Sequence, residues 1–153
     1  MNFVIKENVF LEQLEKIFDE NQSNDVFDKS CIKNPEFLKL VCLFNNIPLG
    51  YVAVYPHSNF MEKEGLNIKF PVEPNAVYIW HIAVKKAFEG KGVASMLMEE
   101  VVQRYSANPI YSVMEEMNSP AIMIHQRVGF RPFAKFKKKY DNQVVNLLLM
   151  KRK

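Results

Sequence analysis

The stretch AVYIWHIAVKKAFEGKGVASMLMEEVVQRY, residues 76–105, joins an apolar run to a helical pattern through a turn that contains two glycines. The run Val77–Val84 is apolar on both faces, and a strand that is buried on both sides belongs in the middle of a sheet. One face is expected to carry Tyr78, Trp80, Ile82 and Val84, and the other Val77, Ile79 and Ala83 beside His81. Apolar residues then recur at i, i+3, i+4 and i+8, which predicts a helix with one buried stripe: Val93, Met96, Leu97 and Val101.

The turn between this strand and this helix contains Gly90 and Gly92, two of only five glycines in the chain. Glycine permits positive φ and lets the backbone approach a ligand without a Cβ in the way. The free N–H groups at a helix N-terminus, with the positive end of the helix dipole, form a site for an anion, and Lys91 adds a cation. A plain strand-to-helix turn is the alternative interpretation.

Two nucleotide-binding patterns are absent from the turn. No Gly-Lys-Ser/Thr follows a four-residue gap, as a P-loop requires, and Ser95 stands where the dinucleotide fingerprint has its third glycine. These residues by themselves therefore favour a plain strand-to-helix turn, and both nucleotide-binding classes are disfavoured.

The rest of the chain predicts further strands and helices around this unit. Strands are expected at residues 3–5, 38–44, 49–55, 110–114, 131–136 and 144–150, the last two paired, with a turn at residues 45–48. Helices are expected from Phe10 to Glu20 and from Pro120 to Val128, the latter with Ser119 as N-cap. Residues 25–34 are ambiguous, and residues 57–75 read as one long loop. This order indicates one α/β domain of the α+β type over residues 1–153.

Composition excludes several classes of protein. At 48% hydrophobic and 24% charged residues, the chain reads as an ordinary soluble globular protein, and no apolar run approaches the roughly 20 residues of a membrane span. No signal peptide is visible, and two cysteines, Cys31 and Cys42, indicate reduced thiols in the cytoplasm. No Cys/His spacing predicts a metal. The net charge of the chain is only +3, and a solvated surface is favoured over a nucleic-acid site for the lysines at 135–139 and 151–153.

Two motifs in the second half of the chain resemble those of the GNAT superfamily, the acyl-CoA-dependent N-acyltransferases. The segment NSPAIMIHQRVGF, residues 118–130, resembles its N-x-x-A-x-x-x-Y-x-x-x-G-F signature, with Asn118, Ala121, Gly129 and Phe130 in register. The glycine turn resembles its pyrophosphate loop, Q/R-x-x-G-x-G/A, with Glu89, Gly92 and Ala94 in the three positions. Glu89 is a departure, because glutamine or arginine is usual there.

The resemblance implies a mixed, mostly antiparallel sheet flanked by helices, and an N-acetyltransferase that uses acetyl-CoA as cosubstrate. The acceptor would be a primary amine of a small molecule, amino acid or peptide; the alternative is an acyl-CoA-binding module with little or no turnover. A membrane or nucleic-acid partner is not expected, and a homodimer is left open. The implied cofactor contacts are Ile82, Ala83, Val84, Glu89, Gly90, Lys91, Gly92, Val93, Ala94 and Asn118.

Catalytic candidates follow from the same resemblance and from side-chain chemistry. His125 stands where the family has a tyrosine, and its unperturbed pKa of about 6.5 suits a general acid; a core histidine is the equally weighted alternative. Tyr111 is a weaker candidate for the acid, and a backbone N–H near Val84 would stabilise the oxyanion. The candidate bases are Glu115, Glu116, Glu73 and His81, and a structural role is favoured for His81.

Overall fold

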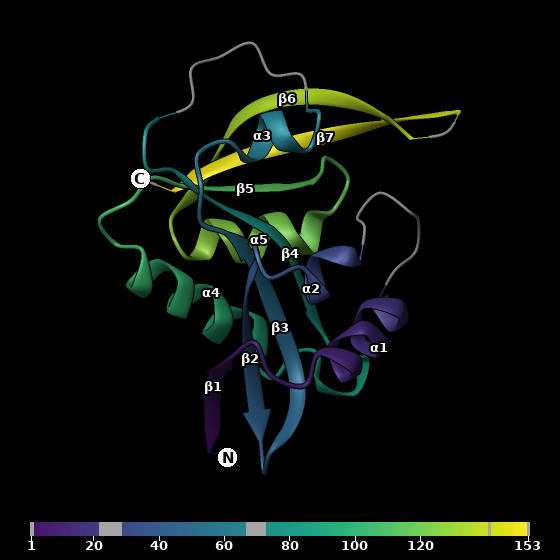
Figure 1. The fold of residues 1–153 in the computed structure, drawn as a ribbon, viewed down its shortest axis with the longest axis vertical. Helices are drawn as coiled ribbons and strands as arrows, with labels where there is room; N and C mark the ends of the chain where they lie inside the picture. The colour runs from purple at the N-terminus through teal and green to yellow at the C-terminus, as the bar shows by residue number, and fades with distance from the viewer. Residues whose placement is uncertain (1, 22–28, 67–72, 141, 153) are drawn as a thin grey trace.

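The protein folds around one seven-stranded sheet (Figure 1). The computed structural model describes residues 2–21, 29–66, 73–140 and 142–152. In chain order the elements are β1 (Phe3–Glu7), α1 (Leu11–Asn21), α2 (Ser30–Lys33), β2 (Leu38–Phe44), β3 (Ile47–Tyr55), α3 (Phe60–Lys63), β4 (Val77–Val84), the 3-10 turn η1 (Lys86–Phe88), α4 (Val93–Arg104), β5 (Ile110–Glu115), α5 (Ser119–Arg127), β6 (Phe130–Tyr140) and β7 (Gln143–Arg152).

The strand order is β1-β2-β3-β4-β5-β7-β6, and every neighbouring pair is antiparallel except β4 and β5. The predicted fold class, a mixed and mostly antiparallel sheet with flanking helices, is thereby confirmed. β4 is a central strand, as its apolar composition predicted. None of the helices in the described segments is long and apolar enough to cross a membrane.

Helices cover both faces of the sheet and create two cores. The first face packs against α1, α2 and α3, and its core contains Leu14, Cys31, Phe60, Tyr78 and Tyr111. The second face packs against α4 and α5, and its core contains Cys42, Ile79, Leu97 and Met114. In Figure 1, α1 and α4 accordingly lie on opposite sides of the strands. Both cysteines are buried free thiols, one in each core.

A β-bulge changes the faces of β4 from those that strict alternation predicted. Ala53 pairs with His81 and Val54 with Ile79, so Trp80 is the extra residue. Trp80 and His81 therefore share the first face with Tyr78, whereas Ile82 and Val84 turn to the second face. The predicted grouping of Tyr78 and Trp80 with Ile82 and Val84 is wrong because alternation holds only without a bulge.

Three local predictions also need correction. The turn is shorter than expected: Asn45 and Asn46 have positive φ of 51° and 62°, as two-residue hairpin turns require, and Ile47 already begins β3. The predicted loop over residues 57–75 contains the short helix α3, anchored by the fully buried Phe60, while residues 67–72 lie outside the described segments. Asn118, rather than Ser119, caps α5, because its side-chain oxygen accepts from the Ala121 N–H at 3.3 Å.

Gly50 lets β3, β4 and the start of α4 approach one another. A Cβ at this position would lie 2.9 Å from the Ala83 carbonyl oxygen and 3.1 Å from Cγ1 of Val93. The main chain of β4 and the first residue of α4 both border the turn that contains Gly90 and Gly92. The space beside Gly50 therefore sets how the strand and the helix meet.

We expect Gly50→Ala to destabilise the protein by about 1–3 kcal/mol, because the added methyl group must displace main-chain atoms. Urea unfolding followed by circular dichroism measures this change. Gly65→Ala is the comparison, since a Cβ there meets none of the described residues within 4 Å and the strain comes from a φ of +65°. A Gly50→Ala variant that is as stable as the parent would show that β3 and β4 do not need this close approach.

Candidate functional site

β4 and β5 part after a short parallel pairing. Only Val77–Ile79 pairs with β5, through Ile110–Ser112, and the bulge at Trp80 follows directly. Bulges bend the strand that carries them. From this point, which we call the vertex, the facing edges of the two strands lack partners in the sheet.

Main-chain groups of β4 face this opening. The Lys85 N–H donates to Leu49 of β3 at 2.8 Å, so in an antiparallel ladder Ala83 and His81 also bond to β3. The N–H and C=O groups of Ile82 and Val84 then point away from β3, toward the opening. This is the arrangement that the sequence predicted for holding the arm of the cofactor.

The end of α1 occupies part of this edge. The side-chain amide of Asn21 donates to the Val84 carbonyl at 2.8 Å and to the Ile17 carbonyl at 2.9 Å. The Glu20 carboxylate accepts from the main-chain N–H of Lys86. The Val84 carbonyl therefore already accepts one hydrogen bond and has one further lone pair, whereas no hydrogen bond from α1 reaches the Val84 N–H.

The glycine turn leaves a row of unsatisfied donors. Within the described part of the chain, the main-chain N–H groups of residues 90–95 have no hydrogen-bond acceptor, and the first helical bond runs from Met96 to Gly92. Gly92 is the N-cap of α4 and has no side chain with which to cap it. These donors, with the helix dipole, suit an anion such as a diphosphate.

The glycines serve backbone conformation rather than space. Gly90 and Gly92 have φ of +77° and +84°, and a Cβ at either position would meet no atom of the described residues within 4 Å. The sequence suggested that glycine stands here because a Cβ would obstruct a ligand. Among the described residues there is no protein atom that a Cβ would obstruct, so that expectation applies only to a bound ligand. The left-handed φ values explain both residues without a ligand.

The other predicted loop residues differ in what they offer. The Glu89 N–H donates to the Lys86 carbonyl at 3.3 Å, so its amide is already engaged. The side chains of Glu89 and Lys91 are exposed, beside the row of amides. Asn118 uses its oxygen to cap α5, whereas its NH₂ group has no acceptor among the described residues.

His125 has the surroundings of a core histidine. It is only 2% exposed; its Nδ1 lies 2.7 Å from the Ala121 carbonyl, and its Nε2 lies 2.7 Å from the Ser112 hydroxyl. A carbonyl only accepts, so Nδ1 carries the proton and Ser112 donates to Nε2. Burial lowers the pKa of His125, partly offset by the Ala121 carbonyl. A neutral imidazole with both nitrogens engaged supports the structural interpretation of this residue.

The structure does not bring the three predicted catalytic residues together. Tyr111 and Glu115 are four residues apart in β5, so both side chains lie on the first face of the sheet. His125 lies on the second face. The Tyr111 hydroxyl donates to Glu73 at 2.9 Å, and burial, with this carboxylate, raises the pKa of Tyr111. Glu115 ends β5, on the edge that no longer pairs with β4.

Two other candidate bases are held by cations. Glu73 pairs with Lys151 at 2.7 Å, which together with the Tyr111 hydroxyl lowers the pKa of Glu73. Glu116 pairs with Lys135 at 2.8 Å. The contacts of Glu73 favour its carboxylate form and make this group a weaker base.

His81 lies under α1 on the first face. Its Nδ1 shares a hydrogen bond of 2.9 Å with the Tyr51 hydroxyl, and its ring lies 4.8 Å from that of Phe18. Burial lowers the pKa of His81 to about 4. His81 is therefore neutral near pH 7, and the structural role favoured by the sequence fits these contacts.

The sequence predicted only that Tyr78 lies on an apolar face of its strand. Its hydroxyl is buried and has no hydrogen-bond partner in the described part of the chain, and burial raises its pKa to about 12. The ring stacks on Phe60 at 5.0 Å and on Tyr111 at 5.4 Å, at the vertex. The only signal in the sequence was a polar atom within an apolar strand; the missing partner is a property of the tertiary structure.

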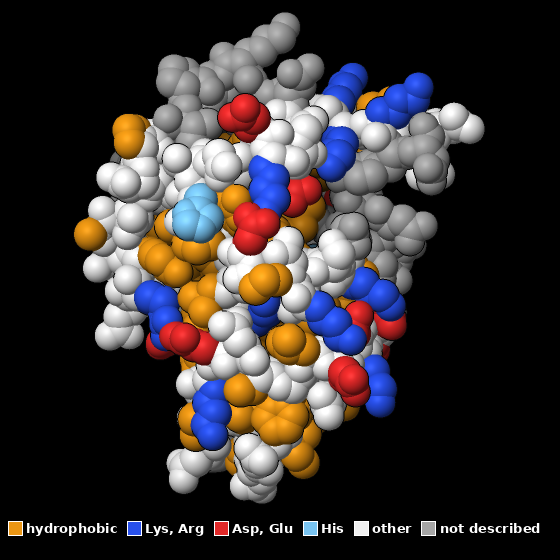
Figure 2. Space-filling view, in the orientation of Figure 1, with side chains coloured by type: hydrophobic (Ala, Val, Ile, Leu, Met, Phe, Trp, Pro, Cys, Tyr) orange, Lys and Arg blue, Asp and Glu red, His pale blue; other side chains and the backbone are white. Residues whose placement is uncertain are grey.

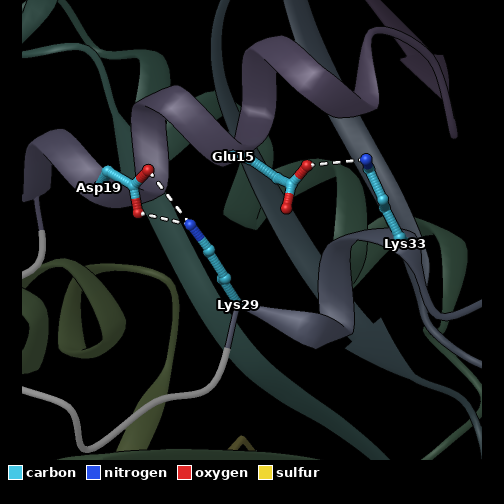
Figure 3. Close-up of polar contacts among 4 residues, drawn as sticks. All are labelled: Glu15, Asp19, Lys29 and Lys33. Atoms are coloured by element: carbon cyan, nitrogen blue, oxygen red, sulfur yellow. Dashed lines mark hydrogen bonds and ion pairs between the residues drawn. The ribbon is translucent and has the colours of Figure 1, made fainter.

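Ion pairs join α1 to α2 and the residue before it, on the first face of the sheet (Figure 3). Lys29 pairs with Asp19 at 3.2 Å and Lys33 with Glu15 at 3.0 Å. Exposed pairs of this kind contribute only about 0.2–1 kcal/mol each. On the face seen in Figure 2, acidic and basic side chains lie next to one another in several places.

Comparisons with known proteins identify a family and several similar structures. The sequence profile of the acetyltransferase (GNAT) family matches residues 7–130, and no curated protein sequence matches the chain. The structure resembles NAA60 of Arabidopsis thaliana bound to acetyl-CoA (TM-score 0.76, 18% identity, 98% of this chain and 97% of that chain). It also resembles the ribosomal-protein-S18-alanine N-acetyltransferase of Escherichia coli (0.75, 12%, 99% and 93%) and the ribosomal-protein-alanine N-acetyltransferase of Brucella melitensis (0.72, 18%, 99% and 99%).

The low pKa of His81 predicts acid sensitivity. The folded state favours the neutral ring, with a pKa of about 4, whereas the unfolded chain binds a proton near pH 6.5. The contribution of His81 to stability is therefore complete above pH 6.5 and falls by about 3 kcal/mol toward pH 4.

Urea unfolding of the protein and of His81→Asn between pH 4 and 7.5 measures this effect. We expect a shallower loss of stability with acid in the variant, and an unchanged loss in His57→Asn, whose ring is exposed. Parallel pH profiles for His81→Asn and the parent would contradict the assignment.

Proposed function

Because this chain belongs to the acetyltransferase (GNAT) family, we propose that it transfers an acetyl group from acetyl-CoA to a primary amine. The observation that carries the proposal is the row of unsatisfied main-chain donors at residues 90–95, beside the opening between β4 and β5. Charge-assisted hydrogen bonds of this kind contribute about 1.5–3 kcal/mol each. The arm of acetyl-CoA would lie along Ile82 and Val84, with Asn118 as a further donor.

The proposed chemistry is direct attack of a neutral amine on the thioester carbon. A main-chain N–H near Val84 would donate to the developing oxyanion, a contribution of about 3–4 kcal/mol in acyl-transfer sites. The C–N bond forms as the C–S bond breaks, and coenzyme A leaves as the thiolate. The proton released from the amine nitrogen passes to solvent or to the thiolate.

Glu115 is the proposed base that takes a proton from the incoming ammonium. It ends β5 on the first face, at the edge that faces the opening beside β4. His81 is neutral, but a group with a pKa of about 4 is a poor base for an ammonium.

Tyr78 is the proposed donor to the leaving thiolate. Its pKa of about 12 is too high for proton transfer to a thiolate with a pKa near 8.5, so its role is a hydrogen bond. Tyr111 and His125, the donors that the sequence suggested, already donate to Glu73 and to Ala121. The unpartnered hydroxyl of Tyr78 breaks no bond when it donates.

The acceptor is proposed to be an amine on a polypeptide, because structural neighbours include ribosomal-protein alanine N-acetyltransferases. The test titrates thiol released from acetyl-CoA with a panel of peptides, amino acids and small amines. We expect release with at least one peptide. Binding of acetyl-CoA in calorimetry without thiol release from any amine would favour the alternative, an acyl-CoA-binding module.

Gly92→Ala tests the loop directly. A φ of +84° strains alanine by about 1–2 kcal/mol, so the variant loop either keeps a strained backbone or changes the positions of its N–H groups. We therefore expect the affinity for coenzyme A to fall about tenfold. Gly65→Ala is the matched control, because its φ is +65° and it likewise has open space. Equal affinities of the two variants for coenzyme A would show that the loop does not contribute to the binding site.

Two side-chain variants test the proposed roles once an acceptor is known. We expect Glu115→Gln to lower kcat about 100-fold and to shift the pH profile, because the base is lost. We expect Tyr78→Phe to lower kcat about tenfold with little change in KM. His125→Asn serves as the comparison for a buried structural residue; a larger loss of kcat in this variant than in the other two, at equal stability, would reverse the assignment.

A further inference from the structure

A second cavity lies at the opposite end of β4 from the glycine loop. Its volume is about 540 Å³, and it is lined by Glu73, by residues 106–109 before β5, by residues 131–133 of β6 and by the end of β7. The Pro109 carbonyl in its wall accepts from the N–H of Val77, the first residue of β4. None of these lining residues belongs to the proposed cofactor or catalytic groups.

Two cations stand directly opposite each other in the wall of this cavity. Arg131 of β6 and Lys151 of β7 are cross-strand partners, so their side chains leave the sheet on the same face. Like charges in this arrangement are destabilising unless something neutralises them. The pair is therefore an energetic cost that an anion would offset.

The structure neutralises only one of these two cations. The Lys151 ammonium pairs with Glu73 at 2.7 Å and lies over the rings of Tyr111 and Phe133 at 5.7 and 5.6 Å. Arg131 is exposed and has no charged or hydrogen-bonding partner among the described residues. One guanidinium in the wall is thus left for a ligand.

An aromatic side chain forms the apolar wall. Pro132 pairs with Met150 and Ala134 with Leu149, so Phe133 is the extra residue of a bulge in β6. The bulge puts Phe133 on the same face as Tyr111, with the two rings 5.6 Å apart and edge to face. Phe133 is 45% exposed, so part of this side chain is open toward the cavity that it lines.

We propose that this cavity binds a small organic anion, with its carboxylate or phosphate between Arg131 and Lys151 and a flat apolar body against Phe133. A guanidinium presents paired N–H donors that match either oxyanion. Pro109 and Pro132 add apolar surface to the same cavity. The site is independent of acetyl-CoA and of the proposed reaction.

Calorimetry and amide chemical-shift mapping with benzoate, phenyl phosphate and neutral benzamide test the proposal. We expect at least one of the two anions to bind saturably and benzamide to bind at least tenfold more weakly. The largest amide shifts should fall in residues 106–108, Arg131, Phe133 and Lys151, because Pro109 and Pro132 have no N–H. A preference for benzoate or for phenyl phosphate identifies which oxyanion the site takes, and either result supports the site.

Variants separate this cavity from general attraction of anions to a basic surface. We expect Arg131→Gln to weaken binding of the anion at least fivefold, and Lys137→Gln, exposed on the same strand but outside the cavity, to leave it unchanged. Absence of saturable binding of either anion, equal binding of benzamide, equal losses in the two variants, or largest shifts in residues 90–95 would each overturn the proposal.

Discussion

The interruption of main-chain hydrogen bonding between β4 and β5 is the constraint on which the rest of the structure depends. A continuous pairing would use the edge of Ile82 and Val84 within the sheet, and no ligand could reach it. The bulge at Trp80 ends the pairing after Ile79 and bends β4. The same bulge turns His81 toward α1 and places Ile82 and Val84 on the face that α4 covers.

The space around this opening is fixed by close packing rather than by strong polar contacts. Gly50 brings β3 against Ala83 and Val93, and the strand-to-helix turn therefore begins from a defined position. The α1 helix adds two long-range contacts, from Asn21 to Val84 and from Glu20 to Lys86. The exposed ion pairs between α1 and α2 contribute little by comparison.

Features encoded locally could be predicted from the sequence, and features that depend on distant partners could not. The strand Val77–Val84 follows from its continuous apolar run, and the helix from Val93 follows from the periodicity of its buried stripe. The bulge at Trp80 carries no local signal, so the assignment of faces failed beyond it. The partner of His125, Ser112, lies on another element, and therefore the sequence left the two roles of the histidine equally weighted. The unpartnered hydroxyl of Tyr78 is likewise visible only once the core is assembled.

The central claim is that main-chain N–H groups of the glycine loop hold the diphosphate of coenzyme A. A titration followed by amide chemical shifts tests it most directly, with pantetheine, which lacks the diphosphate, as the comparison. The account predicts that coenzyme A shifts the amides of residues 90–95 most strongly, together with those of Ile82 and Val84. Pantetheine should shift only the two strand residues. Coenzyme A shifts that leave residues 90–95 unchanged would contradict the claim.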